Sequence, residues 1–203
     1  MNKYLIAVLA VFAISGVALA EGDPQAGQQK AATCAACHGA DGNSPNPAWP
    51  DLAGQHAGYL VQQLQAFKSG TRQNALMSPQ AQGLSEQDML DLAAYYSQQS
   101  NQVEEAPDES VELGSRLYMA GIPERGVAAC AACHGPAGQG VEGAGFPQIG
   151  GQKAAYLANA LRAYRAGERQ TDLNSMMRDV AGKLTDEEIQ ALAGYVSGLY
   201  RAQ

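Results

Sequence analysis

The sequence has few aromatic residues, no run of basic residues and, after its first twenty positions, no long apolar stretch. Aromatic side chains make up 6% of the 203 residues, and 13 Lys and Arg stand against 20 Asp and Glu, for a formal charge of −7. Because no basic patch is available to neutralise phosphates, the composition argues against a nucleic-acid-binding protein. We therefore expect partners that are proteins or small molecules.

Residues 1–20 have the layout of a secretory signal peptide. Lys3 lies in a short basic region, the segment from Leu5 to Ile14 is apolar, and Ala18 and Ala20 form a small-x-small end. We expect cleavage after Ala20 and export to a bacterial periplasm. The alternative is an uncleaved membrane anchor, for which the apolar stretch is short, since a membrane span needs about 20 residues.

The rest of the chain is a tandem duplication. The seven residues around Cys34 recur around Cys130, at an offset of 96 positions. Three further segments recur at offsets of 97, 97 and 100, namely 49–60 at 146–157, 67–73 at 164–170, and 76–97 at 176–197. A solenoid would repeat every 20 to 50 residues or so, and these longer offsets instead predict two homologous domains.

We expect the first domain at 21–100, an acidic, Pro-containing linker at 101–112 and the second domain at 113–203. The first domain has a formal charge of −4 and the second a formal charge of +1. This difference suggests polarised docking, in which the second domain meets an acidic partner through residues such as Arg162 and Arg169.

Both domains are predicted to be helical, because apolar residues recur at helical spacing and strand signals are absent. Ser85 and Asp88 mark the start of a last helix in the first domain, and Thr185 and Glu188 form the matching capping box in the second. A middle helix is expected from near Ala57 to Gly70 and from near Ala154 to Gly167. Domains this small usually need a disulfide, metal or cofactor for stability.

Two C-x-x-C-H motifs indicate which cofactor this is. They comprise Cys34, Cys37 and His38 in the first domain and Cys130, Cys133 and His134 in the second. In haem c attachment, two thiols three positions apart reach the vinyl groups of one porphyrin, and the adjoining imidazole binds the iron. Each imidazole should donate its other ring N–H to a carbonyl, for which Pro50 and Pro147 are candidates. We predict two covalently attached haem c groups.

Three other functions of the four cysteines compete with this prediction. A tetrathiolate zinc site would join ligands 93 positions apart, from Cys37 to Cys130, and would leave both histidines unexplained. A thioredoxin-like redox pair expects a βαβ context, which the pattern lacks. Two structural disulfides would suit an oxidising compartment, but they would not require a histidine after each pair.

A second axial iron ligand should occur in both domains. His56 fails this test because its counterpart is Lys153, whereas Met77 aligns with Met177. Met176 is a close rival of Met177, and a plain core role is the alternative for these methionines. A thioether donates weakly and favours ferrous iron, and filled axial positions leave no site for oxygen or peroxide. This ligand set predicts an electron carrier and not an enzyme.

The chain from Glu21 to Gln203 resembles cytochrome c4, a family of bacterial dihaem cytochromes, in its doubled CAACHG motif and in the segments that follow. The resemblance implies an all-α fold of two tandem cytochrome c domains related by pseudo-twofold symmetry, with the haem edges facing each other across the interface. It also implies that Gly27 and Gly114 lie where the first and last helices of each domain cross. The residues it assigns to the haems are Cys34, Cys37, His38 and Met77, and Cys130, Cys133, His134 and Met177.

The same resemblance implies electron delivery from the quinol-oxidising respiratory chain to a terminal oxidase, often of the cbb3 type, and it leaves peripheral membrane association open. A dihaem peroxidase-type enzyme is one alternative, which would need a displaceable iron ligand and acid–base residues beside it. An electron-accepting subunit of a periplasmic dehydrogenase is another, in which only the partner would differ.

Overall fold

The computed structural model describes residues 21–200, so the predicted signal peptide and its cleavage site lie outside the described residues. Over 21–200 the chain is helical, and β-structure is confined to two isolated bridges, Ile122 with Val127 and Val141 with Phe146. The all-α prediction is therefore confirmed. None of the helices in this part of the chain is long and apolar enough to cross a bilayer.

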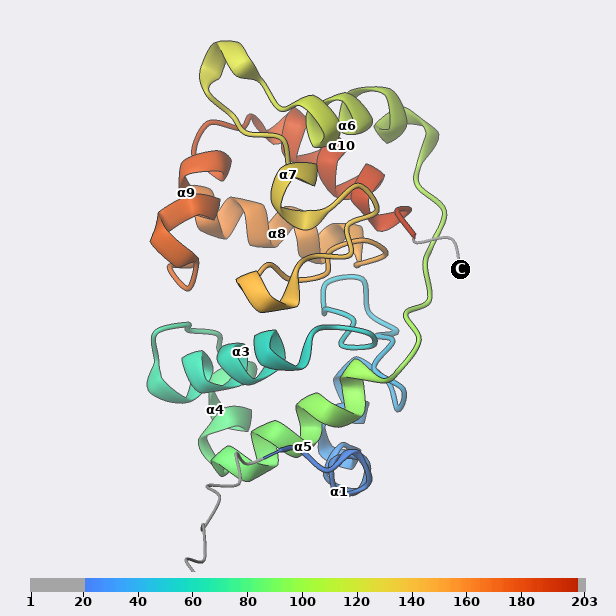
Figure 1. The fold of residues 1–203 in the computed structure, drawn as a ribbon, viewed down its shortest axis with the longest axis vertical. Coiled ribbons are helices and arrows are strands. Elements are labelled where there is room, and N and C mark those ends of the chain that lie inside the picture. The colour runs from blue at the N-terminus through green and yellow to red at the C-terminus, as the bar shows by residue number, and fades with distance from the viewer. Residues whose placement is uncertain (1–20, 201–203) are drawn as a thin grey trace, which may run out of the picture.

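The two halves of the chain lie one above the other (Figure 1). The first half contains α1 (Pro24–Lys30), α2 (Ala32–His38), α3 (Ala57–Ser69), α4 (Met77–Gln82) and α5 (Glu86–Ser97). The second contains α6 (Asp108–Ala120), α7 (Ala131–His134), α8 (Ala154–Arg165), α9 (Met176–Ala181), α10 (Asp186–Ser197) and the 3-10 turns η1 (Pro123–Arg125), η2 (Glu142–Ala144) and η3 (Leu173–Ser175).

The chain between α5 and α6 runs along one side of the molecule (Figure 1). It is shorter than the expected linker, since α6 begins at Asp108, inside the segment 101–112. Asp108 and Glu109 favour this start, because carboxylates in a first helical turn interact well with the positive end of the helix dipole.

The helix boundaries follow the local signals in the sequence. Capping boxes begin both last helices, with Ser85 and Asp88 at α5 and Thr185 and Glu188 at α10. The middle helix α3 ends at Gly70, whose φ of 80° is left-handed. Its counterpart α8 ends two residues before Gly167, which has a φ of 71°.

In each half the first helix crosses the last one at a glycine. A Cβ built on Gly27 in α1 would overlap the carbonyl oxygen of Asp91 in α5, and one on Gly114 in α6 would overlap that of Ala191 in α10. Asp91 and Ala191 are 100 positions apart, so the two crossings are equivalent. The additional residues between Gly114 and Cys130 form the loop around η1.

An apolar core lies in each half. Leu92, Ala93 and Tyr96 of α5 are buried in the first, and Leu192, Ala193 and Val196 of α10 are buried in the second. Met89 and Ile189, which occupy equivalent positions, are 1% and 0% exposed. Met89 is therefore a core residue, as its apolar counterpart predicts.

Candidate functional site

The first C-x-x-C-H motif forms α2, which ends at His38 because Gly39 follows with a φ of 78°. His38 is 6% exposed, and its Nδ1 lies 2.8 Å from the carbonyl oxygen of Pro50. Since a carbonyl can only accept, Nδ1 carries the proton in this hydrogen bond. Nε2 is left with a lone pair that can bind a metal ion.

The second motif repeats this arrangement. Cys130 is the N-cap of α7, and the helix ends at His134 before Gly135, which has a φ of 76°. His134 is also 6% exposed, and its Nδ1 lies 2.9 Å from the carbonyl oxygen of Pro147. Both prolines therefore provide the predicted carbonyl acceptors, and both histidines present Nε2 as the free ring nitrogen.

Burial sets the protonation of these side chains. It lowers the pKa of His38 and of His134, although the proline carbonyls act in the opposite direction. The neutral imidazole that binds a metal is thereby favoured. Burial also raises the pKa of Cys34, and raises that of Cys130 to about 11. These thiols are unlike the acidic thiols of redox-active C-x-x-C pairs.

None of the four cysteines is joined to another in a disulfide, and all four are partly exposed to solvent. Over residues 21–200, no three or more His, Cys, Asp or Glu side chains converge as they would in a metal cluster. The two thiol pairs are thus not brought together as a tetrathiolate zinc site would require.

The candidate methionine ligands lie at the starts of short helices. Met77 is the first residue of α4, and Met176 and Met177 are the first two of α9. The fully buried Ala81 follows Met77 by one helical turn, and the fully buried Ala181 follows Met177 by the same four positions. This register favours Met177 as the equivalent of Met77.

The turn before α9 is strained. Asn174 and Ser175 have φ values of 50° and 61°, in the left-handed region that residues other than glycine rarely adopt. They lie at the insertion that separates the two repeats, immediately before Met176. Strain of this kind persists only where the surrounding structure holds it, and it often accompanies a functional site.

A buried cation lies between the two halves. Arg169 is 5% exposed, donates to Tyr59 Oη at 2.7 Å and to Gln63 Oε1 at 3.0 Å, and lies over the ring of Tyr164. The expectation that Arg169 is a surface docking residue is therefore wrong, because this side chain belongs to the interface. Arg162 remains at the surface, with its side chain 35% exposed.

A second guanidinium points into the same cluster. Arg72, which is 97 positions before Arg169, donates to Gln63 Oε1 at 2.7 Å and to Tyr156 Oη at 3.2 Å. Neither guanidinium has a carboxylate partner among the described residues, although a buried cation needs a counter-charge. This set of groups fits an iron porphyrin. The thiols, imidazoles and thioethers suit its vinyl groups and iron, and the two guanidiniums suit its carboxylate groups.

The interface residues were missed in the sequence. Tyr59 and Tyr156, Arg72 and Arg169, and Gln55 and Gln152 are each 97 positions apart. Their shared offset was a usable signal, because polar residues that recur in both copies of a duplication mark equivalent contacts.

Comparisons with known proteins agree with this geometry. The family model for cytochrome c matches residues 24–100 and again residues 111–199. Cytochrome c4 of Stutzerimonas stutzeri is 44% identical over 210 residues, which cover 98% of this chain and 100% of that protein. The crystal structure of reduced recombinant cytochrome c4 from Pseudomonas stutzeri matches with a TM-score of 0.86 at 44% identity, over 88% of this chain and 100% of that one.

A second kind of relative is named for a different role. A thiosulfate dehydrogenase electron acceptor of Stutzerimonas stutzeri strain A1501 is 43% identical over 185 residues. The match covers 86% of this chain and 83% of that protein.

Proposed function

Because the chain belongs to the cytochrome c4 family, it is a dihaem electron-transfer protein with covalently bound haem c, and we propose that it carries electrons to a terminal oxidase. Its donor is a quinol-oxidising complex, and both reactions take place in the periplasm. The proposed leader is residues 1–20, cleaved after Ala20. The proposed domains are 21–100 and 113–203, joined by 101–112.

The observation that carries this proposal is the matched pair of histidines. His38 and His134 are buried to the same extent, and each donates Nδ1–H to a proline carbonyl, over 2.8 and 2.9 Å. These hydrogen bonds fix the orientation of each ring and make its Nε2 a better donor to iron. When bound, each haem supplies a one-electron couple between ferrous and ferric iron.

We assign the protein ligands in two equivalent sets. Cys34 and Cys37 tether the first haem, with His38 and Met77 as axial ligands. The second set is Cys130, Cys133, His134 and Met177. A methionine thioether donates weakly and so favours the ferrous state, which raises the reduction potential.

We further propose that the protein is a carrier and not an enzyme. Filling both axial positions with His and Met leaves no position at which oxygen or peroxide could bind. A dihaem peroxidase-type enzyme would instead need a ligand that leaves the iron, and an acid–base residue beside it. The two methionines in equivalent positions favour the carrier.

One alternative partner has a specific observation in its favour. The relative named as a thiosulfate dehydrogenase electron acceptor matches 86% of this chain at 43% identity. An electron-accepting role beside a periplasmic dehydrogenase would use the same haem sites with a different donor. Stopped-flow reduction of the oxidised protein by a purified thiosulfate dehydrogenase and by a quinol-oxidising complex would distinguish the two donors by their rates.

The haem assignment is tested by a pyridine haemochrome assay on protein matured in a host with a c-type cytochrome assembly system. We expect two haems per chain in the native protein, and one in each of the double variants Cys34→Ala/Cys37→Ala and Cys130→Ala/Cys133→Ala. Two haems in either double variant would contradict covalent attachment at that pair.

A further inference from the structure

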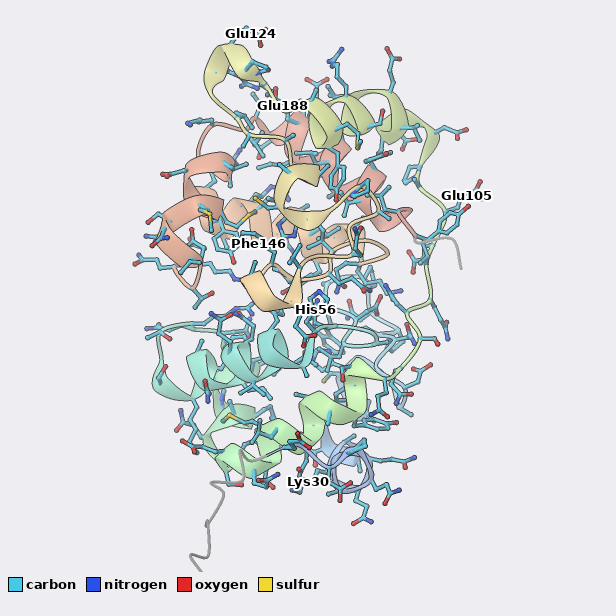
Figure 2. The ribbon with its side chains drawn as sticks, in the orientation of Figure 1. Lys30, His56, Glu105, Glu124, Phe146 and Glu188 are labelled. Atoms are coloured by element: carbon cyan, nitrogen blue, oxygen red, sulfur yellow. The ribbon has the colours of Figure 1, made fainter. Side chains whose placement is uncertain are left out.

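Two buried glutamines join the halves of the molecule. Gln55 precedes α3, Gln152 precedes α8, and each residue is 7% exposed. Figure 2 shows His56, the neighbour of Gln55, between the upper and lower halves. Gln55 and Gln152 are 97 positions apart, so they are equivalent residues of the two repeats.

Each glutamine amide pairs with the backbone of one residue in the opposite half. Gln152 accepts from the N–H of Asp51 at 2.8 Å and donates to the carbonyl of Asp51 at 2.9 Å. Gln55 accepts from the N–H of Gln148 at 3.0 Å and donates to the carbonyl of Gln148 at 2.8 Å. Asp51 and Gln148 are also 97 positions apart, so the four hydrogen bonds are reciprocal.

These bonds end on the same peptide groups that hold the candidate axial histidines. The N–H of Asp51 belongs to the peptide whose carbonyl, that of Pro50, accepts from His38 Nδ1. The N–H of Gln148 belongs to the peptide whose carbonyl, that of Pro147, accepts from His134 Nδ1. One peptide group therefore separates each histidine from a glutamine of the other half.

Each glutamine side chain also forms a hydrogen bond within its own half. Gln55 Oε1 also accepts from the N–H of His56 at 3.0 Å, and Gln152 Oε1 accepts from the N–H of Lys153 at 2.9 Å. These local bonds also orient both amides at the helix starts. Each amide thus presents its oxygen and nitrogen in a fixed direction.

We propose that Gln152 is a positioning residue for His38 and that Gln55 is one for His134, each acting across the interface through a single peptide group. This inference rests on the proposed function, because it concerns His38 and His134 as iron ligands. Hydrogen bonds at the two ends of an amide reinforce each other. A glutamine oxygen on the N–H makes the proline carbonyl a stronger acceptor, and the imidazole then donates more electron density to iron. The glutamine therefore favours ferric iron in the opposite half.

The test is a crossed pattern of reduction potentials. Gln152→Leu removes the oxygen that accepts from the N–H of Asp51, in the peptide group that binds His38. The potential of the haem at Cys34 and Cys37 therefore rises, while the potential of the other haem stays unchanged. Gln55→Leu raises the potential of the haem at Cys130 and Cys133 instead. The potentials are measured by spectroelectrochemical titration, with each haem identified by its NMR signals. The same spectra report the Nδ1–H proton of each histidine, which should move upfield in the opposite half only.

Matched controls separate this effect from loosening of the interface. Tyr59→Phe and Tyr156→Phe each remove an interdomain hydrogen bond to an arginine but leave both glutamines in place. We expect no crossed shift of the Nδ1–H signals in either control. The two leucine variants test the inference independently, so failure of one to fold leaves the other decisive.

Two results would overturn the inference. Either a leucine variant shifts only the haem of its own half, or it leaves both potentials and both Nδ1–H signals at their native values. In both cases the native haem content and thioether absorption would show that the proposed function stands. A protein without bound haem, or without a histidine ligand, would instead overturn the proposed function itself.

Discussion

The guanidinium of Arg169 in the second half donates a hydrogen bond to the hydroxyl of Tyr59 in the first, over 2.7 Å. The reciprocal bond joins Arg72 to Tyr156 over 3.2 Å. The 97-position offset relates both arginines and both tyrosines, so the interface repeats its contacts about a pseudo-twofold axis. Gln63 breaks the symmetry, because it accepts from both arginines.

The interface should lose stability when Arg169 is removed. Arg169→Leu leaves the hydroxyl of Tyr59 without this donor, at a cost of about 1–3 kcal/mol, whereas Gln63 keeps its bond from Arg72. Thermal unfolding of the holoprotein measures the change. Arg116→Leu, at an exposed arginine of α6, serves as the control and should stay within about 0.5 kcal/mol of the native protein. Equal melting temperatures for both variants would show that the Arg169 contacts contribute nothing.

The helix crossings should tolerate no side chain. Gly27→Ala and Gly114→Ala each place a Cβ against a backbone carbonyl of the last helix, which cannot move away as a flexible side chain could. We expect each to destabilise the protein by about 1–3 kcal/mol, the range for overpacking.

Gly58 in α3 provides the matched control for this prediction. No atom lies within 4 Å of a Cβ built there, so Gly58→Ala should stabilise the helix by roughly 0.5–1 kcal/mol. Chemical denaturation of the three variants measures the change in the free energy of unfolding, which should be negative at the two crossings and positive for Gly58→Ala. Destabilisation by Gly58→Ala equal to that by Gly27→Ala would point to a general intolerance of α-helical substitution and not to the crossing.

Acid should weaken the cluster of ion pairs around Lys30 in the first half. Lys30, labelled in Figure 2, lies 2.7 Å from Asp88 and 2.5 Å from Asp91. The Lys30 ammonium lowers the pKa of Asp91, and the N–H of Asp23 lowers it further. A depressed pKa in the folded state gives stability that is present above the unfolded pKa of about 3.9 and is lost as the pH falls toward the folded value.

Unfolding measured from pH 7 to pH 2 tests this cluster. Lys30→Met should be less stable than the native protein at neutral pH, and the difference should shrink below about pH 4, where the aspartates become protonated. A difference that is constant over this range would mean that Lys30 contributes through packing alone. The equivalent position to Asp91 in the second half is Ala191, so the Lys30 cluster is not repeated there.

Substitution of the methionines should show whether Met177 or its neighbour Met176 is the iron ligand of the second half. Met77→Ala and Met177→Ala should each lower one haem potential, halve the near-infrared thioether absorption and open one iron to carbon monoxide, because the weak sulfur donor is lost. Met176→Ala should do none of these. If Met176→Ala, and not Met177→Ala, opens an iron to carbon monoxide, the ligand in the second half is Met176.

The local structure was predictable from the sequence because its causes are local. The capping boxes at Ser85 and Thr185 start α5 and α10, and Pro50 and Pro147 accept from the histidines as their matched spacing suggested. The doubled motifs also led correctly to the family. The start of α6 at Asp108 was not predicted, because the acidic residues there were interpreted as part of a polar linker.

The contacts between the halves could not be predicted in the same way. Nothing in the local sequence distinguishes Arg169 from a surface arginine. Its side chain is buried among tyrosines only because α3 packs beside it. Gln55 and Gln152 bond to backbone groups, which leave no trace in the sequence of the partner. Repetition at a constant offset is the one signal that such residues share.

A coulometric redox titration of the purified, matured protein counts the electrons that each chain carries. We expect each chain to take up two electrons reversibly, in two one-electron steps, each with the spectral change of a low-spin haem. Uptake of a single electron per chain, or steps that depend on added oxygen or peroxide, would contradict a carrier with two equivalent haem sites.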